Sequence, residues 1–259
     1  MLMVINQNRF MLKEERQMAI LNEVELHNRI LLTDIAEKLN VSIDTARRDV
    51  KELDASNKLR KVHGGAISLG FTGLASSNAN IYALEEKIAI AQKAISLIRD
   101  GSVIFIDGGT TCLELVRLIP PNLKLTCFTL SLPVAWQLLS NPDIKVIFIG
   151  GEISKDAQIS VGAYTVHQLS EIRFDYSFIG TGYVDSIHGL TEFDWEIVQV
   201  KKAVIHASKK TVLLCISEKL NSQHQYKTCD INSINTMITE LAPDNNLLNL
   251  YRNQDIHLL

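Results

Sequence analysis

No stretch of the 259-residue sequence is apolar over the roughly 20 residues that a membrane-spanning helix requires. The N-terminus lacks the apolar core and small-residue cleavage site of a secretory signal. Cysteine is scarce, and no two of the four cysteines have the short spacing typical of zinc or redox motifs. We therefore expect a cytoplasmic protein without disulfides, without a metal or other cofactor, and without a membrane partner.

The sequence also has little net charge, −3 at pH 7, which excludes a uniformly basic surface. The charge is unevenly spread, however, because six bases stand against three acids between Arg47 and Lys61. No Lys or Arg follows until Lys87, and the stretch Ser68 to Asn80 is rich in Gly, Ser and Asn, as linkers are. We expect a small domain over residues 1–67, a linker over 68–82 and a larger domain over 83–259.

Beyond the linker, apolar runs of strand length alternate with helical patterns. The strands are expected near residues 102–107, 123–128, 144–149, 174–180, 211–216 and 235–239. The helices are expected near residues 84–98, 111–119, 132–140, 162–170, 194–207 and 244–252. Strands that alternate with helices predict an α/β domain with a parallel, helix-covered sheet.

The first domain has the spacing of a helix-turn-helix. One helix is expected from Glu14 to Glu25, with Met18 and Leu21 on its buried side. A second helix opens at Thr33, a residue type that caps helices, and a tight turn follows it. Asn40 in that turn tolerates the left-handed conformation. Ser42 is then expected to cap a third helix, Ile43 to Ala55.

The third helix predicts two opposite faces. At about 100° per residue, Ala46, Val50 and Leu53 share the inward face, and Asp49 lies close enough to it to orient a neighbour. Arginines on the outward face suit the major groove of DNA, where a guanidinium bonds guanine in bidentate fashion. The alternative without a DNA-binding function is a solvated helix with an incidental arginine pair. The Gly64–Gly65 pair behind the helix favours a hairpin whose basic residues lie along the phosphates. The expected DNA contacts are Thr33, Ser42, Asp44, Thr45, Arg47, Arg48, Lys51, Arg60, Lys61 and His63.

In the second domain, "VIFIDGGTTCLEL" runs from a strand through a glycine turn into a helix. Glycine lets the backbone approach a ligand, and amides at a helix start favour an anion such as phosphate. An ordinary strand–helix turn is the alternative. The turns Thr129–Ser131 and Gly150–Gly151 follow neighbouring strands, and ligands of parallel sheets bind at these strand ends. We expect a shared pocket there.

Both domains resemble a known family. "LLTDIAEKLNVSIDTARRDVKELDASNKLRKVHGGA" resembles the N-terminal region of the DeoR family of bacterial repressors, above all in "RRDVKEL" and "HGGA". "IFIDGGTTCLEL", "TLSLPVAWQL" and "SVGAYT" are similar to its C-terminal effector domain, which is related to sugar-phosphate isomerases and CoA transferases. The resemblance implies a winged helix-turn-helix that binds operator DNA and represses genes of carbohydrate metabolism. It also implies a homo-oligomer, dimer or tetramer, and a phosphorylated sugar or related metabolite as effector.

The expected effector residues combine the glycine turns with positions that match the family. By position Lys219 resembles the family's effector-site lysine, with an ordinary surface lysine as the alternative. For Lys201 and Lys202 the residues favour a solvated helix face with Glu196 as counter-charge, although the family match makes one of the two lysines a candidate site residue. The full set is Asp107, Gly108, Gly109, Thr110, Thr111, Thr129, Ser131, Gly151, Gly162, Glu196, Lys201 and Lys219.

Three residues depart from the family pattern. Gly108 replaces serine, Leu130 replaces asparagine and Ile216 replaces aspartate. Leucine and isoleucine offer no directed hydrogen bonds to a ligand, so we expect an effector with an altered polar part, or weak binding. These departures also leave open a constitutive DNA-binding protein whose second domain only dimerises. A sugar-phosphate isomerase remains the third alternative, with Asp107, Asp175 or Glu196 as general base. Because Ile216 removes a carboxylate and the winged helix gives binding an output, we expect a regulator and not an enzyme.

Overall fold

The chain divides into two compact units, residues 1–69 and 70–259. The computed structural model describes residues 11–69 and 81–259, and each unit is considered by itself. The linker expected over 68–82 lies largely outside the described residues, so its limits stay a prediction.

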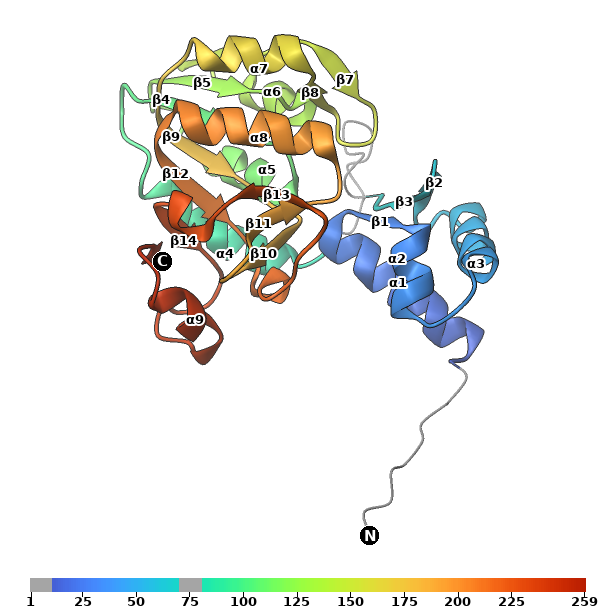
Figure 1. Cartoon of the computed structure of the whole chain (residues 1–259). Helices are drawn as coiled ribbons and strands as arrows, with labels where there is room; N and C mark the ends of the chain where they lie inside the picture. The colour runs from blue at the N-terminus through green and yellow to red at the C-terminus, as the bar shows by residue number, and fades with distance from the viewer. Residues whose placement is uncertain (1–10, 70–80) are drawn as a thin grey trace. The chain divides into compact units, whose positions relative to one another are not determined.

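Residues 11–69 of the first unit form three helices and a small antiparallel sheet (Figure 1). The helices are α1 (Lys13–His27), α2 (Leu32–Lys38) and α3 (Ile43–Ala55). The strands are β1 (Arg29–Leu31), β2 (Arg60–Val62) and β3 (Gly65–Ile67), and β3 lies between the other two. β2 and β3 form the expected hairpin, whereas β1 was not expected from its three residues.

The core of this unit confirms the inward face of α3, since Ala46, Val50 and Leu53 are buried. Met18, expected to be buried, is 60% exposed, and that prediction is wrong. The buried stripe of α1 instead follows Ile20, Val24 and His27, which recur at helical spacing.

The turn between α2 and α3 forms as expected. Asn40 has a left-handed φ of 51°, and the Ser42 hydroxyl accepts the Thr45 N–H at 3.1 Å, so it caps α3. Thr33, however, is not the cap of α2. β1 runs directly into the helix, which begins at Leu32 with Leu31 as its cap residue, and the Thr33 hydroxyl contacts Asp34 at 3.2 Å.

The second unit is built on a seven-stranded parallel sheet with the order β15-β14-β12-β9-β4-β5-β6. Its strands are β4 (Val103–Ile106), β5 (Leu125–Thr129), β6 (Ile144–Phe148), β9 (Phe174–Ile179), β12 (Ser208–Leu214), β14 (Thr236–Ile238) and β15 (His257–Leu258). The predicted α/β class with a parallel sheet is confirmed.

Helices cover both faces of this sheet (Figure 1). One face carries α4 (Leu84–Ile95), α5 (Thr110–Arg117) and α6 (Leu132–Leu138), and the other carries α7 (Ala163–Ser170) and α8 (Trp195–Ala207). The helix expected over 244–252 is divided between the 3₁₀ turn η4 (Asn246–Leu248) and α9 (Asn249–Arg252). Two further one-turn 3₁₀ helices are η2 (Ser217–Lys219) and η3 (Ile231–Ser233).

Five short strands outside the main sheet were not expected. β7 (Glu152–Ser154) and β8 (Ile159–Val161) form a hairpin, and β10 (Tyr183–Asp185), β11 (Gly189–Glu192) and β13 (Tyr226–Cys229) form a second small sheet. The core between sheet and helices includes Phe105, Phe174 and Leu213, all fully buried. Across residues 11–69 and 81–259, no helix has both the length and the apolarity needed to cross a membrane.

Candidate functional site

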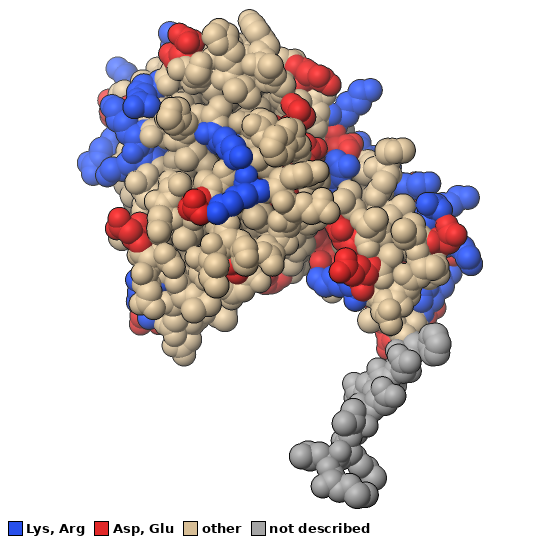
Figure 2. Space-filling model, viewed as in Figure 1, with Lys and Arg blue, Asp and Glu red and all other residues tan. Residues whose placement is uncertain are grey.

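The outward face of α3 presents the predicted DNA-contacting side chains to solvent. Asp44, Arg47, Arg48 and Lys51 are exposed. The guanidinium of Arg47 pairs with the Asp44 carboxylate one helical turn before it. Arg48 and Lys51 have no side-chain partner among the described residues, so both charges are available to an external anion. Figure 2 shows Lys and Arg side chains gathered on the side of this unit where α3 lies.

Contacts from α1 fix the orientation of α3. The Arg16 guanidinium donates to both carboxylate oxygens of Asp49, which is 2% exposed. Farther along the helix, Lys13 lies 2.6 Å from Glu52 Oε2, and Gln17 donates to the same oxygen at 2.8 Å. Asp49 therefore orients a neighbour, as expected.

The hairpin behind α3 depends on its two glycines for different reasons. Gly64 occupies the turn with φ 75°, a value that favours glycine. Gly65 lies in the central strand, where an added Cβ would stand 2.1 Å from the Ile30 carbonyl oxygen of β1. The backbone N–H of Lys61 donates to Asp54 at 2.9 Å and ties the hairpin to α3. Lys61 and His63 are exposed and Arg60 is half-buried, on a hairpin that this bond holds against the C-terminal part of α3.

In the second unit, the loop after β4 leads directly into α5. Gly109 precedes the first turn with φ 100°, and no atom of the described residues lies within 4 Å of the place where its Cβ would stand. The first-turn N–H groups of Thr110, Thr111 and Cys112 have no acceptor within the helix. Thr110 is buried and Thr111 is half-buried. The open glycine position and these amides can hold an anion.

Beside this loop lie four charged residues that we call the charge cluster: the buried residues Asp107, Glu192 and Lys201 and the half-buried Lys219. The Asp107 carboxylate accepts N–H groups from Gly108 at 2.8 Å and from Gly180 at 3.3 Å. Burial raises the pKa of Asp107, and the nearby Lys201 opposes that rise. The cluster lies where β4 and β9 end, as expected for a ligand site of a parallel sheet.

The Lys201 ammonium lies in the interior of this cluster. Its ammonium donates to Glu192 and to the Gly180 carbonyl at 2.9 Å, and it lies 3.8 Å from Asp107 Oδ2. Burial disfavours the ammonium, but the carboxylates of Glu192 and Asp107 outweigh that effect and raise the pKa of Lys201. The solvated-surface interpretation of Lys201 is therefore wrong.

Among the described residues, Lys219 has fewer contacts than Lys201. Its ammonium donates to the Thr181 carbonyl at 2.9 Å, and no carboxylate of the described residues pairs with it. Burial lowers the pKa of Lys219, and Lys201 adds to that effect, whereas Glu192 opposes it. An anion that reached Lys219 would relieve this cost.

Other predicted effector residues have evident structural roles. Thr129 and Ser131 are fully buried; the Thr129 hydroxyl accepts the Ser131 N–H at 3.1 Å, and Ser131 caps α6. Gly151 approaches α7 so closely that an added Cβ would stand 2.0 Å from Thr165 Oγ1. Gly162 precedes α7 with φ 91° and open space around it.

The structure does not bring Glu196 into the cluster. It is exposed on the first turn of α8, and it makes no side-chain hydrogen bond or ion pair with the described residues. The acid that contacts Lys201 is Glu192, which sequence reasoning missed. The sequence offered little signal for it, because Glu192 ends the short segment "GLTE", in which leucine is the only strongly apolar residue.

The three departures from the family pattern lie in packed surroundings. Leu130 is 1% exposed within the main core, and Ile216 is 3% exposed directly before η2. A Cβ on Gly108 would stand 3.0 Å from Ile159 Cγ2, so β8 occupies the space that a larger residue would need. Asp175 lies at the opposite end of β9, where it tethers Val103 and Lys209 and where those bonds lower its pKa.

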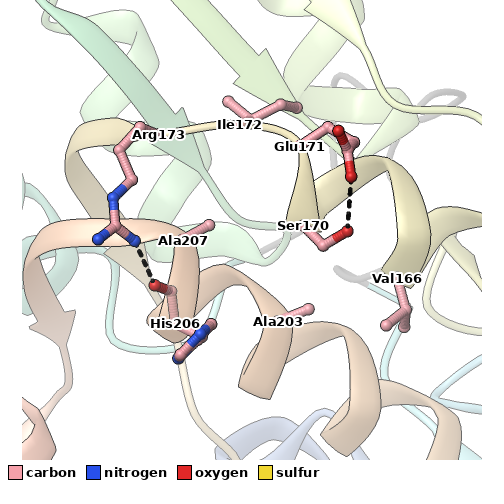
Figure 3. Close-up of a pocket in the computed structure, with 8 residues that line it drawn as sticks. All are labelled: Val166, Ser170, Glu171, Ile172, Arg173, Ala203, His206 and Ala207. Carbon is pink, nitrogen blue, oxygen red and sulfur yellow. Dashed lines mark hydrogen bonds between the residues drawn. The ribbon is translucent and has the colours of Figure 1, made fainter.

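The hollow drawn in Figure 3 is not part of this site. It has a volume of about 490 Å³ and lies where residues 170–173 enter β9 and His206 leads into β12. Arg173 donates to the His206 carbonyl across it at 3.0 Å. Within the described parts of the chain, no group of three His, Cys, Asp or Glu residues is placed to hold a metal ion.

The sequence is similar along almost its whole length to known transcription regulators. The model of the DeoR-like helix-turn-helix domain matches residues 16–70, and the model of the DeoR C-terminal sensor domain matches residues 83–241. An uncharacterised helix-turn-helix regulator of Haemophilus influenzae is 32% identical over 91% of this chain and 93% of its own. The repressor GlcR of Bacillus subtilis is 31% identical over 96% of each chain. The glycerol-3-phosphate regulon repressor of Escherichia coli is 29% identical over 96% of this chain and 99% of its own.

Similarity to solved structures is weaker. Ribose 5-phosphate isomerase A of Methanocaldococcus jannaschii is 20% identical over 52% of this chain and 53% of its own, with a TM-score of 0.38. A likeness at this level carries no argument about activity.

Proposed function

The chain belongs to the DeoR family of helix-turn-helix transcription regulators, and on that premise we propose that it represses genes of carbohydrate metabolism under the control of a phosphorylated metabolite. In this proposal the α3 face binds operator DNA in the cytoplasm, and the second unit binds the effector. The chain is a homo-oligomer, because paired recognition helices are needed to contact two half-sites one helical turn apart.

One observation carries the proposal. On α3 the chain presents the cations Arg48 and Lys51, which have no partner within residues 11–69 and 81–259, and in its second unit it has an open anion loop beside Lys219. The first feature supplies a DNA-binding surface, and the second supplies a site for a phosphate. Neither requires a chemical reaction, because a difference in effector affinity between two arrangements of the oligomer is enough to change operator affinity.

For the α3 face we propose that Arg47 and Arg48 contact base edges and phosphates, with Thr45 and Lys51 on the flanks. Arg60, Lys61 and His63 contact phosphates from the β2–β3 hairpin. Thr33, Ser42 and Asp44 complete the interface at the start of the two helices.

For the effector site we propose that the first-turn amides of α5 and the Thr110 and Thr111 hydroxyls hold the phosphate, with Lys219 as its counter-ion. Asp107, Glu192 and Lys201 lie beside that loop and support it. The Asp107 carboxylate already accepts backbone N–H groups, and the Glu192 carboxylate already accepts the Lys201 ammonium, which supports binding without catalysis.

Apolar Leu130 favours a second candidate, a constitutive regulator whose sensor domain serves only to dimerise. The two functions are separated by selecting an operator fragment from random DNA with the full chain. Its affinity is then measured with glycerol 3-phosphate, glucose 6-phosphate, fructose 6-phosphate or ribose 5-phosphate. Release by one compound supports effector control, and unchanged operator affinity with all four supports the constitutive alternative.

A further inference from the structure

The one-turn helix η2 carries two neighbouring side chains that face different partners. The Lys219 ammonium donates inward to the Thr181 carbonyl at 2.9 Å. Beside it, the Glu218 carboxylate accepts the phenol hydroxyl of Tyr82. Tyr82 precedes α4 and lies thirteen positions after Leu69, the last residue of the first unit. The η2 turn thus connects the charge cluster with the segment that leads to the DNA-binding unit.

Tyr82 and its neighbour are held by side-chain contacts. The buried Lys87 ammonium donates to the Tyr82 carbonyl, and it also lies 5.8 Å from the centre of the Tyr82 ring. Ala83 has a φ of 51° and a ψ of 46°, in the left-handed region that an alanine side chain disfavours. Because the local preference of Ala83 opposes this conformation, the contacts of Tyr82 help to maintain it.

A second path joins α4 to η2. Lys93 on α4 donates to the carbonyls of Thr239 at 2.8 Å and Leu241 at 2.6 Å. Between them, Glu240 accepts the Ser217 N–H at 3.0 Å and also its hydroxyl. The start of η2 is therefore anchored to the far end of α4, while its exposed side reaches Tyr82. Because the start of the turn is fixed, a shift of Lys219 changes the Tyr82–Glu218 contact.

We propose that the hydrogen bond between Tyr82 and Glu218 couples the effector site to the DNA-binding unit, an inference that rests on the proposed function. An anion at the α5 loop draws the Lys219 ammonium away from Thr181 and moves η2. The Tyr82–Glu218 bond then changes, and Ala83 leaves its left-handed conformation. Tyr82 and Glu218 are positioning residues that do not touch the anion. The contact has two states, and the effector and operator must favour different ones.

The first test uses the full chain, its selected operator, and inorganic phosphate and glycerol 3-phosphate as probes. In Tyr82→Phe, calorimetry should give probe affinities within about twofold of wild type, as should operator affinity without probe. The probe-induced loss of operator affinity, of the order of 5- to 150-fold for such coupling, should shrink at least about threefold. The matched control Tyr164→Phe, an exposed tyrosine on α7, should keep the full loss. A full loss in Tyr82→Phe overturns the coupling role.

A second test needs no probe and separates this inference from the proposed function. Amide hydrogen exchange is measured at the start of α4 in Lys219→Met. Exchange there should rise about threefold or more, because the turn loses its Thr181 anchor. The same substitution in a Tyr82→Phe background should leave that exchange unchanged. If none of the four sugar phosphates releases wild type from its operator, the proposed effector control fails. This exchange measurement still decides the coupling, because no response in Lys219→Met overturns it.

Discussion

Asp49 on α3 accepts two hydrogen bonds from the guanidinium of Arg16 on α1, one of them 3.0 Å long between Nη2 and Oδ1. The pair joins the helix proposed to read DNA to the helix behind it. The side chains of Asp49 and Arg16 are 3% and 14% exposed, respectively, so solvent screens their charges little. The orientation of α3 therefore depends in part on an ion pair that lies away from the DNA-facing surface.

Replacing Asp49 with Ala should destabilise the first unit by about 3 kcal/mol, because Arg16 would stay buried without its partner. Thermal or urea unfolding of the full chain, followed by a probe in the first unit, measures the loss. Asp44→Ala is the matched control, since its pair with Arg47 is exposed and should contribute at most about 1 kcal/mol. Equal effects from the two substitutions would contradict the role given to Arg16.

Arg48→Ala should weaken operator binding about 10- to 100-fold, as expected when a bidentate base contact is lost. Arg47→Ala should have a smaller effect, because Arg47 first has to leave Asp44. Fluorescence anisotropy with labelled operator measures both affinities. Lys145→Ala, an exposed substitution on β6, serves as the control. Calorimetry should find effector binding unchanged in all three variants, and its loss with Arg48→Ala would refute the division between the two units.

The two hairpin glycines should respond very differently to alanine. Gly64→Ala introduces a left-handed alanine into open space and should cost about 1 kcal/mol. Gly65→Ala would place a Cβ against the Ile30 carbonyl and separate β1 from β3, at a cost of about 3 kcal/mol. Unfolding curves and operator affinity measure the difference. Similar stabilities for the two variants would show that β1 does not pack against Gly65 as described.

Substitutions of the two lysines in the charge cluster should have different effects. Lys219→Met should weaken sugar-phosphate binding about tenfold or more while the fold keeps its stability, since a charge-assisted bond to phosphate is lost. Lys201→Met should instead destabilise the second unit by about 3 kcal/mol, because Glu192 and Asp107 lose their counter-ion. Calorimetry and unfolding curves on both variants give the comparison. The reverse assignment of the two effects would contradict the proposed site.

Effector binding should depend on pH through Lys219. Burial lowers the pKa of the free Lys219 ammonium, so the group loses its proton at a lower pH than an exposed lysine does. A bound phosphate stabilises the ammonium and raises that pKa again, so binding takes up protons. Uptake should be larger at pH 9 than at pH 7, and affinity should fall as the pH rises. Calorimetry in buffers of different ionisation enthalpy measures the uptake, which should vanish in Lys219→Met.

Periodic features of the sequence predicted most of the structure correctly. The α3 stripe, the Ser42 cap and the Asn40 turn depend on neighbouring residues, and each forms as expected. The six strands expected in the parallel sheet are present, each at the short apolar run that predicted it. The missed strands are two to four residues long, and β1 also depends on pairing with β3, which is distant in sequence.

The candidate site was predictable only in part for the same reason. The Gly109 turn and Lys219 were found from local pattern and family resemblance. Glu192 was not found, because its contact with Lys201 joins β11 to α8 and leaves no mark at a fixed spacing. Thr33 failed as a cap because β1 leads straight into α2, so the chain is already in position when the helix begins.

The central claim is that one chain binds operator DNA through α3 and releases it when a phosphorylated metabolite occupies the second unit. It is tested most directly by measuring the operator affinity of the full chain with and without sugar phosphates, beside Arg48→Ala and Lys219→Met. We predict that wild type is released by at least one compound, that Arg48→Ala binds operator poorly in every condition, and that the operator affinity of Lys219→Met does not respond to the compound that releases wild type. Release of Lys219→Met at the wild-type effector concentration would contradict the account.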